Sequence, residues 1–160
     1  MNAALKVAPP EPLWFIDAVA RIHVDGDDTD GRLSVVEVSA RLGDMPPLHV
    51  HHREDEVFHV LEGRMTIHLP GEQIELETGS TLLAPRGVPH TYRVESETAR
   101  CLVVCQPAGF ESFVGAISQP APSEELPPLD REHDLAAINA AAEAHGIELL
   151  GPPGALPEAP

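Results

Sequence analysis

The chain has 160 residues and carries 26 acidic side chains against 10 basic ones, which gives a formal net charge of −16. A chain of this length is expected to form one domain with room for a full hydrophobic core. Nucleic acid and anionic membranes would repel so acidic a protein, and no apolar run approaches the roughly 20 residues that span a bilayer, so neither is expected as a partner.

Residues 1–11 are proline-rich and predict an extended arm. They lack the long apolar core of a signal peptide, which predicts a cytoplasmic protein. The apolar stretches 14–16, 19–24 and 33–42 predict strands, with a cluster of turn-forming residues at 25–31. An exposed edge strand at 14–16 would gain from pairing with another subunit, so we expect a homodimer.

From residue 47 onward, strand signals come at short and regular intervals, with glycine and proline between them. Many short strands separated by turn residues are typical of an all-β sandwich or barrel. We therefore predict a barrel domain over residues 12–118. Its further strands are expected at 47–52, 56–62, 64–69, 73–77, 80–84, 89–95 and 99–105.

Beyond the last strand, residues 110–117 predict a short helix or lid piece, and 119–129 form a proline-rich linker. Residues 130–151 are expected to form a carboxy-terminal helical segment packed on the barrel. Its helix is expected near 131–145, with Asp130 as N-cap and Gly146 as C-cap. The final residues, 152–160, predict a mobile tail.

The two cysteines, Cys101 and Cys105, fall in one predicted strand. Four residues of strand separate them by about 13 Å, which is beyond disulfide reach. They share a face, and we interpret them as free thiols that act as small buried hydrophobic residues.

Four potential metal ligands lie in two short blocks of the chain. His49 and His51 are two residues apart in a predicted strand, so both imidazoles project from one face and can chelate one ion. The polar stretch that follows is short enough for a hairpin turn that returns Glu56 beside them. His90 would complete a set of three histidines and one carboxylate. The alternative is that these are exposed polar positions, but the turn glycines and the distant His90 favour metal binding.

Three consecutive acidic residues, Glu54, Asp55 and Glu56, compete for the role of the carboxylate ligand. Only Glu56 opens the apolar run 57–61, so only Glu56 is anchored on a strand. The other two are expected in the turn.

The remaining histidines have simpler interpretations. His52 and His59 should point away from the ligand face. His52 is one residue from His51 and His59 is three residues from Glu56, so each should project from the opposite side of the strand. Arg86 is interpreted as a charge in a turn. The histidines without ligand spacing are interpreted as surface or satisfied polar residues: His23, His68, His133 and His145.

Strand alternation also predicts which apolar residues lie beside the ligands. Phe58 and Val60 should share the face of Glu56, and Tyr92 should share the face of His90. Phe58 and Tyr92 are candidate walls of a substrate pocket, since each lies two residues from a ligand. Val60 is interpreted as barrel core.

These blocks resemble the two motifs of the cupin superfamily. The first motif is a glycine, five residues, His-x-His, three or four residues, a glutamate, six residues and a second glycine. The second motif is a glycine, five residues, Pro-x-Gly, two residues and a histidine, and an asparagine follows after three more residues. The sequence departs from the second motif only at Val94, which replaces that Asn, a residue that is not a ligand in the family. The matching positions are Gly43, His49, His51, Glu56 and Gly63 in the first motif and Gly79, Pro85, Gly87 and His90 in the second.

The resemblance extends to small single-domain cupins that are similar to quercetin dioxygenases. It implies a conical cupin β-barrel, also described as a double-stranded β-helix or jelly roll, with a carboxy-terminal α-helix. It also implies one divalent metal ion at His49, His51, Glu56 and His90, and often a homodimer. A three-nitrogen, one-oxygen ligand set without thiolate suits iron, manganese, cobalt, nickel or zinc.

The function implied is a metal-dependent dioxygenase that uses O2 and a small aromatic or enolic hydroxylated substrate. In flavonol dioxygenases the motif glutamate accepts the substrate proton, which by resemblance assigns Glu56 as the catalytic base. Two other classes remain open because one fold hosts many functions. One is a lyase, isomerase or cyclase that consumes no oxygen, and the other is a non-catalytic small-molecule binding protein.

Overall fold

Apolar and polar residues alternate along the central strands, and this alternation gives each strand a buried inner face and a more exposed outer face. The computed structural model describes residues 8–160. Most of the predicted arm, residues 1–7 of 1–11, lies outside the described residues.

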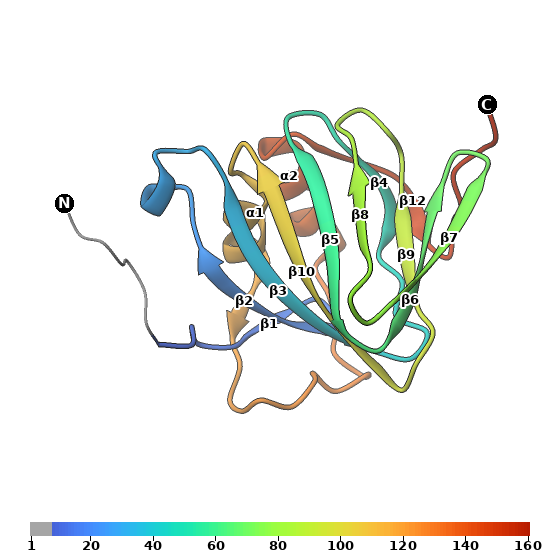
Figure 1. Cartoon of the computed structure of the whole chain (residues 1–160). Coiled ribbons are helices and arrows are strands. Elements are labelled where there is room, and N and C mark those ends of the chain that lie inside the picture. The colour runs from blue at the N-terminus through green and yellow to red at the C-terminus, as the bar shows by residue number, and fades with distance from the viewer. Residues whose placement is uncertain (1–7) are drawn as a thin grey trace.

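The larger layer is a seven-stranded antiparallel sheet with the order β11-β1-β2-β3-β10-β5-β8 (Figure 1). Its first strand, β1, pairs with β2 on one side and with β11 on the other, so the stretch predicted as an exposed edge strand is covered within the chain. The strands are β1 (Leu13–Phe15), β2 (Ala18–Val24), β3 (Ser34–Arg41), β5 (Asp55–Glu62), β8 (Thr81–Ala84), β10 (Thr98–Gln106) and β11 (Gln119–Pro120).

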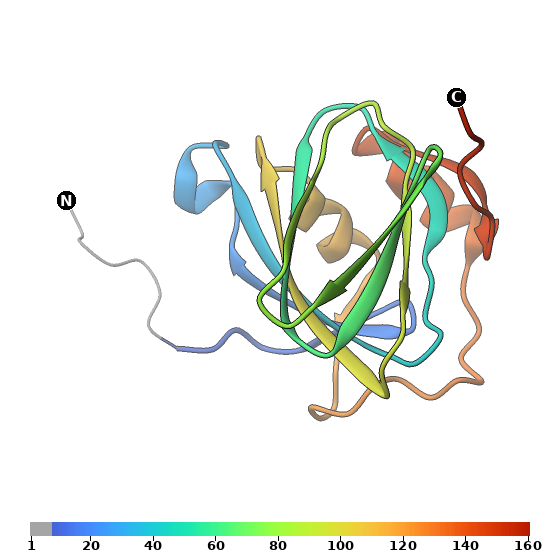
Figure 2. The same cartoon turned by 45° about the vertical axis from the view of Figure 1, so that its right-hand side comes forward.

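The second layer combines a three-stranded sheet, β7-β6-β9, with the strand pair β12-β4. An isolated antiparallel bridge between His49 and His90 joins these two groups. Figure 2 shows the two layers closing around a common interior. The strands of this layer are β4 (Pro47–His51), β6 (Arg64–Leu69), β7 (Glu72–Glu77), β9 (Thr91–Val94) and β12 (Ile147–Pro153).

Two α-helices and one 3-10 turn, η1 (Asp27–Thr29), complete the structure. Helix α1 (Phe110–Ile117) forms where a short helix or lid is predicted, and it packs against β3 and α2 (Leu135–Ala144). Phe15 anchors α1 through edge-to-face contacts with Phe110 and Phe113, at ring-centroid distances of 6.1 and 5.8 Å. Among residues 8–160, neither helix is long and apolar enough to cross a membrane.

The carboxy-terminal helix is shorter than predicted. Its N-cap is Asp134, whose side chain accepts a hydrogen bond from the Ala137 amide at 3.0 Å, so the prediction of Asp130 is wrong. Gly146 follows the helix at a φ of +73°, as the predicted helix end requires. The predicted helical segment 130–151 is also wrong at its end, because the chain after Gly146 is the strand β12, which pairs with β4.

The interior is filled by aliphatic and aromatic side chains from both layers, together with the two cysteines. Cys101 and Cys105 are free and buried, as predicted. Burial raises the pKa of Cys101 to about 12 and that of Cys105 further, so both remain neutral thiols.

The motif glycines can be tested as a matched pair. Gly63 and Gly79 both have positive φ, +86° and +91°, but an added Cβ at Gly63 would lie 2.4 Å from the Thr98 carbonyl oxygen, whereas at Gly79 it would meet nothing within 4 Å. Gly79→Ala should lower the free energy of unfolding by about 1 to 2 kcal/mol through backbone strain alone. Gly63→Ala should lower it by at least about 2 kcal/mol more, since the clash adds to the strain. Urea unfolding measures both, and equal losses would contradict the importance of the contact.

Candidate metal centre

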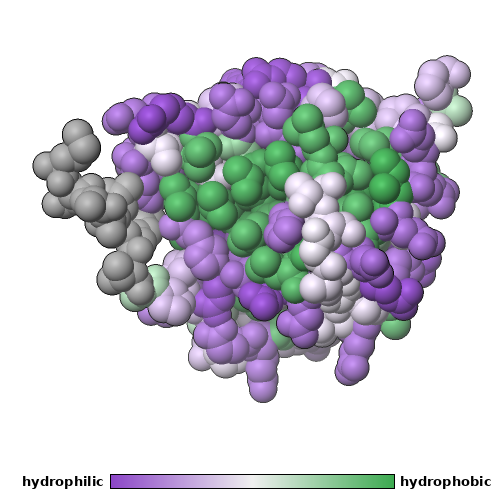
Figure 3. Space-filling model, in the orientation of Figure 1, coloured by the Kyte–Doolittle hydropathy of each residue, from purple (hydrophilic) through white to green (hydrophobic). Residues whose placement is uncertain are grey.

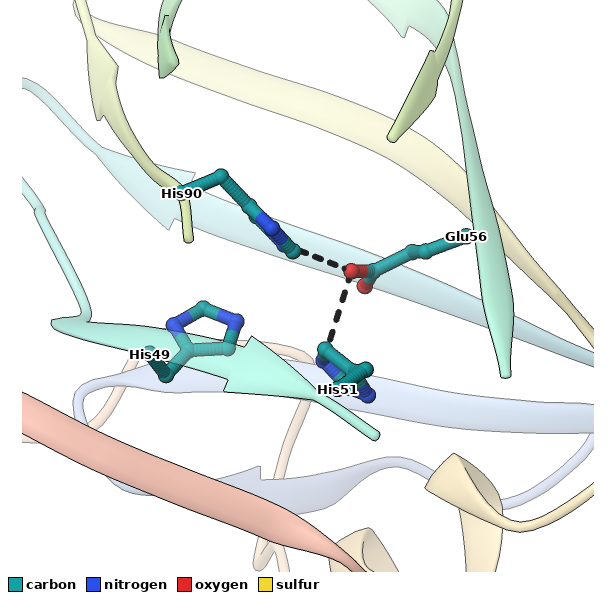
Figure 4. Close-up of side chains that lie close together, drawn as sticks. All are labelled: His49, His51, Glu56 and His90. Atoms are coloured by element: carbon teal, nitrogen blue, oxygen red, sulfur yellow. Dashed lines mark hydrogen bonds and ion pairs between the residues drawn. The ribbon is translucent and has the colours of Figure 1, made fainter. Parts of the chain in front are cut away.

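The structure brings the four predicted ligand residues together inside the barrel. His49 and His51 come from β4, Glu56 from the start of β5, and His90 from the residue before β9 (Figure 4). One nitrogen from each histidine and one carboxylate oxygen all lie within 4.8 Å of one another. His51, Glu56 and His90 are at most 3% exposed, and His49 is partly exposed.

The Nδ1 atoms of two histidines face backbone carbonyl oxygens. His49 Nδ1 lies 2.7 Å from the Pro47 oxygen, and His90 Nδ1 lies 3.0 Å from the Val88 oxygen. A carbonyl oxygen can only accept, so each Nδ1 must carry the proton and donate it. In the neutral rings, Nε2 then presents a lone pair.

The Nε2 atoms of His51 and His90 converge on a carboxylate. His90 Nε2 lies 2.8 Å from Glu56 Oε2, and His51 Nε2 lies 3.3 Å from the same oxygen. Within the described part of the chain, the buried His51 Nε2 has no hydrogen-bond partner. A proton or a metal cation can satisfy such a convergence of atoms, and three imidazole nitrogens with one carboxylate oxygen are a donor set that divalent transition metals use. The cluster is therefore able to hold a metal ion.

The ionisation of two of these residues suits ligation. Burial, and then the charges of His90 and His51, lower the pKa of His49 to about 3, so its ring is neutral near pH 7. Burial alone would raise the pKa of Glu56, but the interactions with His51 and His90 outweigh it and lower this pKa to about 2. A neutral imidazole and an ionised carboxylate are the forms that bind metal.

The three competing acidic residues take three different positions. Asp55 turns outward and accepts hydrogen bonds from Arg86 Nε and Nη2, both at 3.1 Å, which lower the pKa of Asp55. Arg86 is interpreted from the sequence as a charged turn residue. Its hydrogen bonds to Asp55 connect the loop before His90 to the start of β5. Glu56 faces the cluster.

Glu54 is a candidate site residue that sequence reasoning missed. It is 1% exposed rather than in an open turn, and its Oε1 lies 3.2 Å from His51 Nδ1. A carboxylate in this place fixes the tautomer of the imidazole and leaves Nε2 for the ion. Strand alternation could have identified Glu54, because Glu54 lies two residues from Glu56 and therefore on the same face.

The other histidines lie outside the cluster. His52 is exposed and pairs with Glu148 at 2.7 Å, and His59 Nδ1 lies 2.7 Å from Thr81 Oγ1. His68 corrects the prediction of a surface or satisfied residue: it is 9% exposed, and its Nδ1 has no partner among residues 8–160. The remaining three each have a hydrogen-bond partner: His23 with Glu37, His133 with Asp17, and His145 with the Ala141 carbonyl.

The two predicted pocket residues lie beside the cluster. Phe58 is 2% exposed, and its ring centroid lies 6.0 Å from that of His90 and 6.2 Å from that of Tyr92. Tyr92 also lines a groove of about 1860 Å³ that runs between β6, the β3–β4 turn and α2. Neither Phe58 nor any of the four cluster residues lines this groove. Val60 is fully buried, as its interpretation as core requires.

Comparison with known proteins agrees with this geometry. A family model described as a cupin domain matches residues 36–105. The quercetin 2,3-dioxygenase of Bacillus subtilis is 34% identical over 104 residues, which cover 65% of this chain and 31% of that protein. An uncharacterized protein of Streptomyces coelicolor is 39% identical over 56 residues, 35% of this chain and 53% of that protein. The chain thus spans between 31% and 53% of the length of the curated relatives it matches.

Solved structures share the fold. The polyketide cyclase RemF of Streptomyces resistomycificus is 28% identical with a TM-score of 0.52, and the match covers 66% of this chain and 79% of that one. KdgF of Halomonas sp. matches with a TM-score of 0.52 at 22% identity, over 57% of this chain and 79% of that one, a likeness of fold alone.

The barrel and its matching sequence blocks define a cupin domain. Residues 36–105 form this cupin domain, and 104 residues of the chain are similar to a quercetin 2,3-dioxygenase. The prediction of an all-β cupin fold is confirmed.

Removal of single imidazoles tests the cluster. His49→Ala or His90→Ala should leave purified protein with a small fraction of the wild-type metal, because each removes one of four convergent donors. Elemental analysis measures this. His59→Ala is the matched control, since His59 lies on the opposite face of β5 and should leave the metal content unchanged. Unaltered metal in both ligand variants would refute the assignment.

The role of Glu54 has its own test. Glu54→Ala should weaken metal affinity by about 10- to 100-fold, because it frees the His51 ring to turn and leaves its Nδ1 without an acceptor. Glu54→Gln should lose less, since its amide oxygen can still accept. Chelator competition measures both affinities. Asp55→Asn, which removes a charge on the outward side, serves as the control, and a wild-type affinity in Glu54→Ala would contradict the role.

Proposed function

We propose that this cupin is a metal-dependent dioxygenase that acts on a small aromatic or enolic hydroxylated compound similar to a flavonol. The observation that carries the proposal is a buried carboxylate, Glu56, held in its ionised form among three histidines inside an apolar barrel. The similarity to a quercetin 2,3-dioxygenase supports the same reaction class.

His49, His51, Glu56 and His90 would hold one divalent ion, which is iron, manganese, cobalt, nickel or zinc in this proposal. The bound ion would supply Lewis-acid chemistry, which lowers the pKa of a substrate hydroxyl. The protein's own contribution is to fix the donors. The Pro47 and Val88 carbonyls and the Glu54 carboxylate each hold one imidazole by its Nδ1.

Glu56 is the proposed base. Its carboxylate is ionised near pH 7 and lies at the centre of the cluster, within hydrogen-bond distance of His90 Nε2. A hydroxyl that binds in this space would meet a carboxylate oxygen at the distance that proton transfer requires. The substrate, once deprotonated, is electron-rich enough to react with dioxygen, and both oxygen atoms enter the product.

Phe58 and Tyr92 are the proposed walls of the substrate space. Phe58 packs against His90, and its ring would offer an edge or an offset face to a substrate ring. Burial and the nearby charge of Asp44 raise the pKa of Tyr92 well above its usual value, so its hydroxyl stays protonated and can donate to a substrate oxygen.

A second candidate is a lyase, isomerase or cyclase that consumes no oxygen. The match to the polyketide cyclase RemF favours it, because that protein shares both the fold and 28% of its aligned residues. The same buried carboxylate would then move a proton between carbons or oxygens of the substrate.

Glu56→Gln tests the proposed base. The variant can keep a donor oxygen but cannot accept a proton as a carboxylate, so substrate-dependent oxygen consumption should fall by about 100-fold or more while metal content falls much less. An oxygen electrode with quercetin and simpler enols or catechols gives the rate, and elemental analysis gives the metal content. If oxygen consumption and metal content fell in proportion, Glu56 would act only as a metal ligand and not as a base.

The reaction class is decided by wild-type protein loaded separately with iron, manganese, cobalt or nickel. Oxygen uptake with at least one substrate supports a dioxygenase. Product formation under anaerobic conditions, without oxygen uptake in air, would replace it with the lyase, isomerase or cyclase. Binding without turnover would leave a non-catalytic cupin.

A further inference from the structure

The groove that Tyr92 lines approaches the metal cluster from the side of His49. Pro47 lies two residues before His49 on β4, and Leu149 is the register partner of His49 on β12, so both share its strand face. Both of these residues line the groove, as Tyr92 does. His49 is also the member of the cluster that is partly exposed, whereas the other three are at most 3% exposed. A compound that occupies the groove would therefore reach the cluster at His49.

Apolar side chains form much of the groove wall. Within residues 8–160, six large apolar side chains are exposed, and four of them line the groove: Leu42, Leu129, Leu135 and Leu156. The buried Met65 and Leu76 contribute to it as well. Its volume of about 1860 Å³ is larger than the about 300 to 1,000 Å³ that is typical of small-molecule pockets. The groove therefore has the surface and the room for an aromatic compound with side groups.

A second apolar surface covers the outer face of the seven-stranded sheet, as Figure 3 shows in the orientation of Figure 1. It faces away from the cluster, because alternate residues of β3, β5 and β10 point inward and are buried. Of these two apolar surfaces, the groove is the one that borders the cluster.

The groove is also acidic. Five carboxylates line it against three arginines, in a chain with a formal net charge of −16. The acidic residues are Asp17, Asp44, Glu75, Glu77 and Glu95, and the arginines are Arg41, Arg64 and Arg93. A groove with this balance attracts a cationic compound and repels an anionic one.

Asp44 brings this charge to the cluster end of the groove. After burial, the charge of Asp44 is the next cause of the raised pKa of Tyr92, which places the carboxylate near the Tyr92 hydroxyl. Burial and then the charge of Asp17 raise the pKa of Asp44 itself to about 6, and Arg41 offsets only part of this rise. A cation bound beside Asp44 would relieve the repulsion between the two carboxylates, whereas the carboxylate of a ligand would add to it.

We propose that the substrate enters through this groove and is a hydroxylated aromatic compound that carries a positively charged amine, with Asp44 as the residue that binds the amine. The ring lies along the apolar wall, and the face of Tyr92 adds a cation–π contact to the amine. Compounds of the same shape that carry a carboxylate are excluded by charge. The identity of the hydroxylated ring rests on the proposed function, but the preference for a cation is a property of binding and requires no oxygen.

Three catechols that differ in charge test the role of Asp44. Catechol is neutral, dopamine carries an amine, and 3,4-dihydroxybenzoate carries a carboxylate. Titration calorimetry with zinc-loaded protein under anaerobic conditions measures binding without turnover, since zinc has no redox chemistry. Wild-type protein should bind dopamine at least about tenfold more tightly than 3,4-dihydroxybenzoate, and Asp44→Asn should reduce this preference by about fivefold or more. Glu62→Gln is the matched control, because it removes the same charge from β5 outside the groove and should leave the preference unchanged.

A bulky thiol label tests the route. Leu42→Cys, at a groove residue that is 61% exposed, should lose at least about tenfold in dopamine affinity once a large maleimide is attached, because the label fills the groove. Leu83→Cys, at a residue that is 56% exposed and outside the groove, should keep its affinity when labelled. The native Cys101 and Cys105 are buried with raised pKa values, so the label does not reach them.

Equal affinities for the three catechols, no binding of any of them, or an unchanged preference in Asp44→Asn would overturn the charge assignment. Wild-type affinity in labelled Leu42→Cys would overturn the route. If no metal-loaded protein consumes oxygen but these binding differences hold, the dioxygenase reaction is refuted and the groove assignment stands.

Discussion

The backbone bridge between His49 and His90 closes the barrel and builds the site at the same time. The His49 amide donates to the His90 carbonyl at 3.2 Å, and the His90 amide donates back at 2.9 Å. This pair of bonds joins β4 to the start of β9, and therefore the strand pair β12-β4 to the sheet β7-β6-β9. Two of the four candidate ligands are thus fixed by the contact that joins the two parts of the second layer.

The first layer contributes the remaining constraints. Glu56 enters the cluster from β5, whose register with β10 and β8 is set by continuous pairing on both sides. Helix α1 supports His51 from another direction, since the Phe110 ring lies 5.8 Å from the imidazole. The buried Glu111 holds this helix in place by accepting hydrogen bonds from the Gly26 and Gly109 amides, at 3.0 and 2.7 Å. The buried Glu111 carboxylate thus holds α1, and α1 in turn packs against the candidate ligand His51.

Local features of the fold could be predicted from the sequence because local spacing determines them. Strand alternation places His49 and His51 on one face, and glycines at positive φ mark the turns. The helix start was mispredicted because Asp130 and Asp134 are both residues that favour N-caps, and residue type alone does not distinguish between them. The strand β12 depends on pairing with β4 about a hundred residues earlier, which no local pattern records.

Strand β5 shows how the two faces of one strand separate the site from the outer surface. Glu56 and Phe58 point inward to the cluster, while Val57 between them points outward. Pairing with β10 on one side and with β8 on the other fixes the register of these residues. Because the side-chain period of a strand is two residues, a slip of one residue would turn Glu56 out of the cluster and bring Val57 into it. The register of β5 therefore decides whether the proposed base and the proposed pocket wall face the histidines of β4.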